Sequence, residues 1–331
     1  MRTILARPRL IQLVLVLVIA TLGALAVVQP GHGQSRLARI GYLAWAECLR
    51  TDSTFLQRLR ELGHVEGQTF TLECQSAQAD YARLGAAAAA LVAHRVDVIV
   101  ALNHPTAKTA IEATREIPVV MVASGDPVQA GLVASLARPG GNATGLTYYA
   151  TELTAKRLEL LREMLPRSKR IGVLHNPAVG YLPFLDDTRR AARLLGLGLD
   201  VVEVQRATEL ESAFQGLSGR RVHAVFVLPD LLLAREAPQI GRLGLKYRLP
   251  VMAWGRWFTE AGALLSYSGD YGGMFRRAAE YVDRILRGAK PADIPVEQPS
   301  RFQLVLNLRT ARTLGIVIPP SVLARADEVL Q

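Results

Sequence analysis

Enzyme motifs are missing from this chain of 331 residues. No G-x-G-x-x-G follows a predicted strand, and neither a Walker-type lysine loop nor a G-x-S-x-G turn is present, which argues against dinucleotide, phosphate-loop and hydrolase sites. The six histidines include no pair at the spacing of helical metal ligands. We therefore expect no catalytic residue, no cofactor and no metal site.

Acidic residues are fewer than basic ones: the chain has 29 Asp and Glu and 39 Lys and Arg, which gives a net charge of +10. The basic residues are scattered and accompany no zinc-finger or recognition-helix pattern, so nucleic-acid binding is not expected. An anionic ligand, an anionic membrane surface and a plain solvated surface all fit the charge. Charge alone therefore identifies no partner.

Charged residues are nearly absent from the first 35 positions, where only three arginines stand. Leu10 to Val28 is apolar apart from two residues, and the small residues of Ala24-Leu25-Ala26 suit a signal peptidase. We expect residues 1–33 to hold a signal peptide and a short tail, with a mature, periplasmic chain that starts between Val27 and Leu37. The alternative is an uncleaved N-terminal membrane anchor. No cysteine follows the apolar run, so a lipid anchor is not expected.

Short β-rich runs alternate with amphipathic helical stretches from residue 39 onward. Val96 to Leu102, VDVIVAL, is a continuous apolar run, which is typical of a central parallel strand covered on both faces. One helix is expected to begin at Pro105, and another to run unbroken over 231–247. The expected strands cover 39–45, 69–74, 96–102 and 117–123, then 170–174, 199–204, 222–228 and 250–253. This alternation predicts an α/β fold of two doubly wound parallel-sheet lobes.

Three segments have the composition of crossings between the two lobes: 140–149, 264–268 and 291–300. The first lobe is then expected to hold residues 37–147 and 265–296. The second lobe is expected to hold residues 148–264 and 297–331. Because ligands of such folds lie at the carboxyl ends of the strands, the loops after the strands should face a cleft between the lobes.

Four segments carry a resemblance to a known family: LRELGHVEGQ (59–68), GDPVQAGLVASLARPGGNATGL (125–146), KRLELLREMLP (156–166) and the long stretch 288–329. The chain resembles the substrate-binding proteins of ABC transporters with a type I periplasmic-binding-protein fold. Some relatives in its branch bind aromatic amino acids. The resemblance implies a small-molecule ligand trapped between two lobes, a permease and an ATPase as partners, and no catalysis. We expect a monomer or a weak dimer.

Candidate ligand-binding residues of the first lobe follow its third and fourth strands. A helix that begins at Pro105 should expose backbone N–H groups to a carboxylate, with Asn103, His104 and Thr106 around them. Asp126 could hold a ligand amine. The alternatives are helix capping for Asn103 and His104 and turn formation for Asp126. Asn103-His104 also departs from the family pattern, in which Gly or Ser with Thr often precedes the proline.

The second lobe offers Asn176 and Asp230 in equivalent loops, each with a turn-forming alternative. Trp45, Trp254 and Tyr267 lie near strand ends and could stack on a flat ligand, although a core role suits each of them as well. Together these residues predict a ligand with an anionic or strongly polar group and a flat or apolar part. An amino acid, aromatic ones included, meets both demands.

Cys48 and Cys74 are the only cysteines, and an exported chain would carry them into an oxidising compartment. They are expected at the ends of neighbouring parallel strands, so we predict a disulfide between them, with two buried thiols as the alternative.

For the whole chain three functions stay open. A transport receptor is favoured over a sensory receptor domain of the same fold, and both are favoured over an α/β enzyme.

Overall fold

The computed structural model describes residues 36–48, 53–148, 151–177 and 184–331. The predicted signal peptide and tail lie outside these residues, so their assignment stays a prediction. Residues 38–331 form one compact unit that contains both sheets. None of the helices in the described part of the chain combines the length and apolar character that a bilayer crossing requires.

The first sheet has the strand order β2-β1-β3-β4-β5, and all of its strands are parallel. Its strands are β1 (Ala38–Ala44), β2 (Phe70–Ser76), β3 (Val98–Asn103), β4 (Val119–Ser124) and β5 (Ala143–Thr147). Its helices are α2 (Thr54–Glu61), α3 (Leu84–Ala93) and α4 (His104–Ala113), to which α11 (Tyr271–Leu286) is added from much later in the chain. The expected strands are therefore present with shifted ends.

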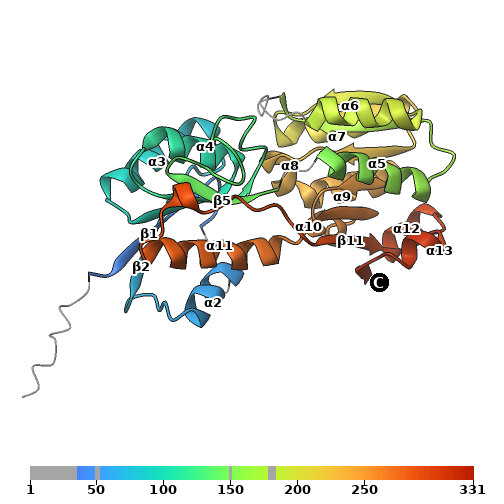
Figure 1. Ribbon diagram of the computed structural model, residues 1–331. Coiled ribbons are helices and arrows are strands. Elements are labelled where there is room, and N and C mark those ends of the chain that lie inside the picture. Colours follow the sequence, from blue (N-terminus) through green and yellow to red (C-terminus); the bar gives the residue numbers. More distant parts are fainter. Residues whose placement is uncertain (1–35, 49–52, 149–150, 178–183) are drawn as a thin grey trace, which may run out of the picture. The chain divides into compact units, whose positions relative to one another are not determined.

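The centre of the first sheet is buried on both faces, as the apolar run of β3 predicts. Val98 and Val100 belong to one buried cluster together with Phe55 of α2 and Ala278 of α11. Ile99 and Ala101, which alternate with them along the strand, belong to another cluster with residues of α3 and α4. Figure 1 shows α3 and α4 above this sheet and α2 and α11 below it. Successive side chains thus supply two different cores.

The second sheet has the order β12-β11-β10-β9-β8-β6-β7, in which only the β10–β11 pair is antiparallel. Its strands are β6 (Arg170–His175), β7 (Gly198–Glu203), β8 (Ala224–Val227), β9 (Val251–Ala253), β10 (Leu265–Gly269), β11 (Phe302–Asn307) and β12 (Glu328–Leu330). Residues 265–269 pair with β9 and β11, which corrects their expected place in the first lobe. The other lobe boundaries stay a prediction.

Helices cover both faces of the second sheet. They are α5 (Thr151–Met164), α6 (Phe184–Leu195), α7 (Leu210–Gly219), α8 (Leu231–Arg235), α9 (Ala237–Lys246), α10 (Arg256–Glu260), α12 (Leu308–Leu314) and α13 (Pro320–Leu323). A 3₁₀ turn at Ala207–Glu209 precedes α7, whereas the 3₁₀ turns at Tyr81–Arg83 and Pro291–Asp293 contact α3 and β5 of the first sheet's layers. The single helix expected over 231–247 is two helices, α8 and α9. Pro238 lies in the first turn of α9, where its missing N–H disturbs no helical hydrogen bond.

The chain passes between the two sheets three times. It leaves the first sheet after β5, returns after Gly269 to build α11, and leaves again through the segment that precedes β11. Along this last segment the amide of Glu297 donates to the carbonyl of Gly145 in β5, at 2.9 Å. The second crossing therefore follows β10, whereas the sequence placed it at residues 264–268.

A disulfide joins Cys48 to Cys74, with 6.1 Å between their Cα atoms. Strands β1 and β2 are parallel neighbours in which Tyr42 lies opposite Cys74, and Cys48 follows shortly after the end of β1. The bond therefore closes the carboxyl ends of these two strands, as predicted.

Candidate functional site

A cavity of about 520 Å³ lies at the carboxyl ends of strands from both sheets. From the first sheet it is lined by the ends of β3 and β4 and the start of α4. From the second sheet it is lined by the residues that follow β8 and β9. The start of α11, which follows β10, completes the wall. Parallel strands direct their loops and helix starts to one edge of a sheet, which is why residues far apart in sequence meet here.

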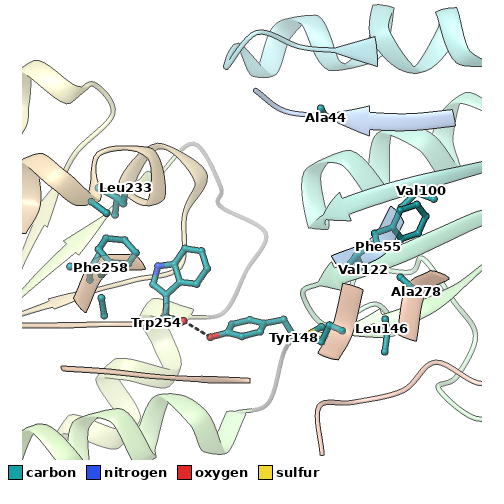
Figure 2. Close-up of a cluster of buried hydrophobic side chains, with 14 of the residues drawn as sticks. Ala44, Phe55, Val100, Val122, Leu146, Tyr148, Leu233, Trp254, Phe258 and Ala278 are labelled. Carbon is teal, nitrogen blue, oxygen red and sulfur yellow. Dashed lines mark hydrogen bonds between the residues drawn. The ribbon is translucent and has the colours of Figure 1, made fainter. Parts of the chain in front are cut away.

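Aromatic rings form much of this wall. The ring centroids of Trp254 and Trp257 lie 4.9 Å apart at 88°, and those of Trp257 and Tyr271 lie 5.2 Å apart at 73°. Tyr148 approaches both Trp254 and Tyr271, at 6.1 and 5.0 Å between centroids. Figure 2 shows the hydroxyl of Tyr148 reaching the main chain of Trp254, to whose carbonyl it donates at 3.0 Å. We call Tyr148, Trp254, Trp257 and Tyr271 the aromatic wall.

Asp230 is the carboxylate among the described residues that line the cavity. It caps α8 by accepting from the amide of Leu233 at 2.9 Å, and it also accepts from Asn176 Nδ2 at 3.1 Å and from the Tyr81 hydroxyl at 3.4 Å. All three donors are neutral groups. Burial raises the pKa of Asp230, and these hydrogen bonds partly oppose the rise. A cationic group in the cavity would be stabilised by this carboxylate.

The start of α4 carries a capping box. The amide of Thr106 donates to Asn103 Oδ1 at 3.2 Å, and the amide of Asn103 donates to Thr106 Oγ1 at 3.1 Å. Pro105 has no N–H. The run of open backbone donors expected at 103–106 is therefore largely occupied by the chain itself, which corrects that expectation. Among the described residues, the buried Asn103 Nδ2 has no hydrogen-bond acceptor and remains a donor at this end of the cavity.

His104 is buried in the same corner, 2% exposed, and its Nδ1 lies 3.3 Å from Ser124 Oγ. Burial lowers the pKa of His104 to about 4, with a further lowering by Lys108 and an opposing effect of Asp126. The imidazole is therefore neutral at pH 7. A second buried donor is Trp254 Nε1, for which the described residues provide no acceptor.

Known proteins resemble this chain in both sequence and fold. A family model described as "ABC transporter substrate binding protein" matches residues 47–330. The chain belongs to this family. Members of the substrate-binding protein family bind small molecules, work with other ABC-transporter components outside the cytoplasm and are in general not enzymes.

Three known proteins illustrate the likeness. The tyrosine-binding protein of Clostridioides difficile is 29% identical over 263 residues, which are 79% of this chain and 75% of that protein. An ABC domain from Streptococcus pneumoniae solved in complex with L-Trp is 28% identical, has a TM-score of 0.82, and is matched over 89% of this chain and all of its own. The leucine-binding protein LivK of Thermotoga maritima, at 14% identity and a TM-score of 0.55 over 78% of each chain, shows the fold alone. The fold is that of type I periplasmic binding proteins.

Four of the nine candidate binding residues of this substrate-binding protein line the cavity, namely Asn103, His104, Asp230 and Trp254. Two more are hydrogen-bonded to lining residues: Thr106 to Asn103 in the capping box, and Asn176 to Asp230. Whether any of them binds ligand stays a prediction.

The other three candidates lie elsewhere. Asp126 Oδ1 accepts from the amides of Val128 and Gln129, so it forms a turn. Trp45 is buried against Tyr81, with 5.4 Å between ring centroids, and does not itself line the cavity. Tyr267 is half-buried, stacks on Phe302 and packs against the core of the second sheet.

Several lining residues were missed by the sequence analysis: Tyr81, Tyr148, Phe184, Trp257, Tyr271 and Phe275. Most of them lie on helices or 3₁₀ turns, whereas the strand-end rule points to loops directly after strands. The aromatic run Trp254-Gly-Arg-Trp257 is unusual in the sequence, and its second tryptophan could have been found from that signal.

Proposed function

We propose that this protein is the extracytoplasmic receptor of an ABC importer and that it encloses its ligand in the cavity between the two sheets. The supporting observation is that the cavity wall is shared by both lobes, which the chain joins through three crossings. A ligand that contacts both walls favours the closed arrangement, and this shift in population signals occupancy to a permease. The protein catalyses no reaction.

The ligand that suits this wall is an aromatic amino acid or a close relative. The aromatic wall offers large rigid surfaces to a ring, and Asp230 offers a negative charge to an ammonium group. Asn103 Nδ2 and Trp254 Nε1 are donors for which a carboxylate supplies acceptors. The L-Trp complex and the tyrosine-binding relative support the same ligand class.

Native mass spectrometry of freshly purified protein identifies a retained ligand, and calorimetric titration then tests the class with four probes. L-Tryptophan and L-tyrosine carry ring, amine and carboxylate, tryptamine lacks the carboxylate, and indole-3-propionate lacks the amine. We expect both amino acids to bind and each truncated probe to bind at least about tenfold more weakly. Binding of none of these, with a sugar or an aliphatic solute retained instead, would contradict the proposed ligand class.

The importer role needs its own experiment. A transporter-dependent uptake assay with membranes that contain the cognate permease and ATPase should show ligand uptake only when the receptor is added. Ligand binding without any such uptake would favour a sensory receptor domain. N-terminal sequencing of the exported protein completes the proposal, because a mature start between Val27 and Leu37 is expected and a start at Met1 would contradict cleavage.

A further inference from the structure

Arg157 of α5 is the largest fully buried side chain of the described residues, with 1% exposure. Its Nε donates to the carbonyl of Tyr267 at 2.8 Å, and its Nη2 donates to the hydroxyl of Tyr148. The guanidinium carbon also lies 5.7 Å from the centroid of the Tyr148 ring. Both acceptors are uncharged oxygens. A permanently charged group is thus held in the interior by dipoles and by a ring face.

Such an arrangement is costly for stability, because a guanidinium loses its hydration on burial and no carboxylate accepts either of these two hydrogen bonds. The neighbouring charged residue on the same helix, Lys156, pairs in the ordinary way with Glu159. The location of Arg157 therefore calls for a role other than stability.

One of the two acceptors stands at a crossing, and the other lies in a strand of the second sheet that leads to the next crossing. Tyr148 follows β5, at the first crossing, and Tyr267 lies in β10, just before the second. Arg157 thus ties the first crossing, at Tyr148, to β10 of the second sheet. Tyr148 in turn contacts two residues that line the cavity, because its hydroxyl donates to the carbonyl of Trp254 and its ring contacts Tyr271.

We propose that Arg157 is a positioning residue: it holds the Tyr148 phenol so that the aromatic wall keeps the geometry that a ligand meets. The proposal rests on the proposed function for its effect on binding. Arg157 is absent from the cavity lining and acts through Tyr148. The phenol oxygen of Tyr148 accepts a hydrogen bond from Arg157, and the phenol proton is donated to the carbonyl of Trp254.

Hydrogen–deuterium exchange of the ligand-free protein tests the positioning role directly. Arg157→Met should speed amide exchange in residues 145–148 and 252–257 by about tenfold, while the strands at the sheet centres keep their protection. Arg162→Met is the matched control, since Arg162 is an exposed residue of the same helix whose guanidinium bonds the carbonyl of Leu195. Unchanged exchange in these two segments of Arg157→Met would overturn the proposal.

A double-mutant cycle tests the route to the ligand, with L-tryptophan as the probe. Arg157→Met and Tyr148→Phe should each weaken binding by about tenfold, and the double variant should bind no more weakly than the weaker single variant. Additive losses would overturn action through Tyr148. Tyr148→Phe removes one oxygen atom and keeps the ring, so it carries the exchange test as well if Arg157→Met folds poorly.

The two levels of proposal fail in different ways. A wild-type protein that binds neither aromatic amino acid contradicts the proposed function, whereas the exchange experiment needs no ligand and still decides the role of Arg157. A protein that binds L-tryptophan but shows the same affinity in Arg157→Met overturns the positioning role and leaves the proposed function intact.

Discussion

At the scale of residues, two aspartates that follow strands in opposite lobes differ in what surrounds them. Asp126 accepts two backbone amides of its own turn and does not line the cavity. Asp230 also caps a backbone amide, but it is buried, 6% exposed, and borders the cavity. Equivalent positions along the chain thus supply a turn former in one lobe and a candidate charge partner in the other.

We predict that Asp230→Asn weakens binding of an amine-bearing ligand by about 1.5 to 3 kcal/mol, because a neutral amide replaces the carboxylate whose negative charge strengthens the hydrogen bond to an ammonium group. Asparagine caps helices about as well as aspartate, so the stability of the fold should change little. Asp126→Asn is the control and should leave the affinity unchanged. Calorimetric titration of both variants with L-tryptophan checks this, and equal affinities for Asp230→Asn and wild type would contradict it.

His104 predicts a dependence of stability on pH. Burial lowers its pKa in the folded state to about 4, below the usual value near 6.5. As the pH falls from about 6.5 towards 4, the unfolded chain binds a proton that the folded chain does not, so folding stability is lost in that window.

Urea denaturation at pH 7 and at pH 4.5 measures the free energy of unfolding that each protein loses between these values. The loss should be smaller in His104→Gln than in the wild type by about 2 to 3 kcal/mol. The same substitution at the exposed His94 is the control for the loss of a histidine as such. Identical pH profiles for wild type and His104→Gln would show that this histidine is not buried neutral.

The residues of the site could be predicted only in part. Trp254 and Asp230 were found because they follow central strands, whose ends meet at one edge of the sheet. Tyr267 was chosen by a similar argument, yet its half-buried side chain stacks on Phe302 and packs against the core of the second sheet, away from the cavity. The strand-end rule places a backbone, whereas the parity of residues along the strand decides which face a side chain enters.

At the scale of elements, β5 depends on one glycine. Gly145 has φ +128°, and a Cβ built there would lie 2.1 Å from the carbonyl oxygen of Met121 in β4. Gly145→Ala should therefore cost at least about 2 kcal/mol of unfolding free energy, from strain and displaced strand pairing.

Gly216 in α7 is the matched control for the same substitution. It is exposed, and an added Cβ there meets no atom within 4 Å. Gly216→Ala should stabilise the protein by about 0.5 to 1 kcal/mol, because glycine is a poor residue for helix interiors. Denaturant unfolding of both variants gives the comparison, and similar changes for the two would contradict the role of Gly145.

The disulfide joins the ends of β1 and β2 and closes a separation of 26 residues. In the chain-entropy model, its removal in Cys48→Ser/Cys74→Ser should cost about 3 to 4 kcal/mol. Denaturant unfolding of the oxidised wild type, the reduced wild type and the double variant measures this. The two forms without the bond should agree, and a double variant as stable as the oxidised protein would contradict the prediction.

Most elements of the alternating βα pattern could be predicted, because their apolar runs are dense and their helices begin at proline, aspartate or serine. Helix α11 was not predicted, although Met274, Ala278, Tyr281 and Ile285 are buried at helical spacing and Asp270 caps its first turn. The two glycines in that first turn obscured the signal. Strands β11 and β12 were also missed, since their pairing partners lie far away in the sequence.

At the scale of the whole molecule, the repeat of the α/β pattern after residue 150 was enough to predict two lobes. The exact division of the chain was not, because it depends on long-range pairing that no local pattern contains. β10 illustrates this: its sequence suits a crossing strand, and only its neighbours β9 and β11 assign it to the second sheet.

The first lobe is completed late, since α11 covers the face of its sheet that also carries α2. We predict that a chain truncated after residue 270 is cut readily by protease within residues 38–147, whereas the full chain resists cleavage there. The truncation also removes strands β11 and β12 of the second sheet. Cleavage sites are therefore mapped by mass spectrometry, and only those within 38–147 are counted, because they report on the first lobe. Equal resistance of this region in both chains would contradict the prediction.

Late completion of the first lobe also matters during synthesis. A ribosome delivers the residues of the first sheet well before those of α11, and until then an apolar face formed by Val98, Val100, Val120 and Val122 is covered only in part, by α2. The lobe therefore cannot complete its fold as a finished unit before α11 has been synthesised. The same connectivity that joins the two lobes thus delays the moment at which the first becomes a stable domain.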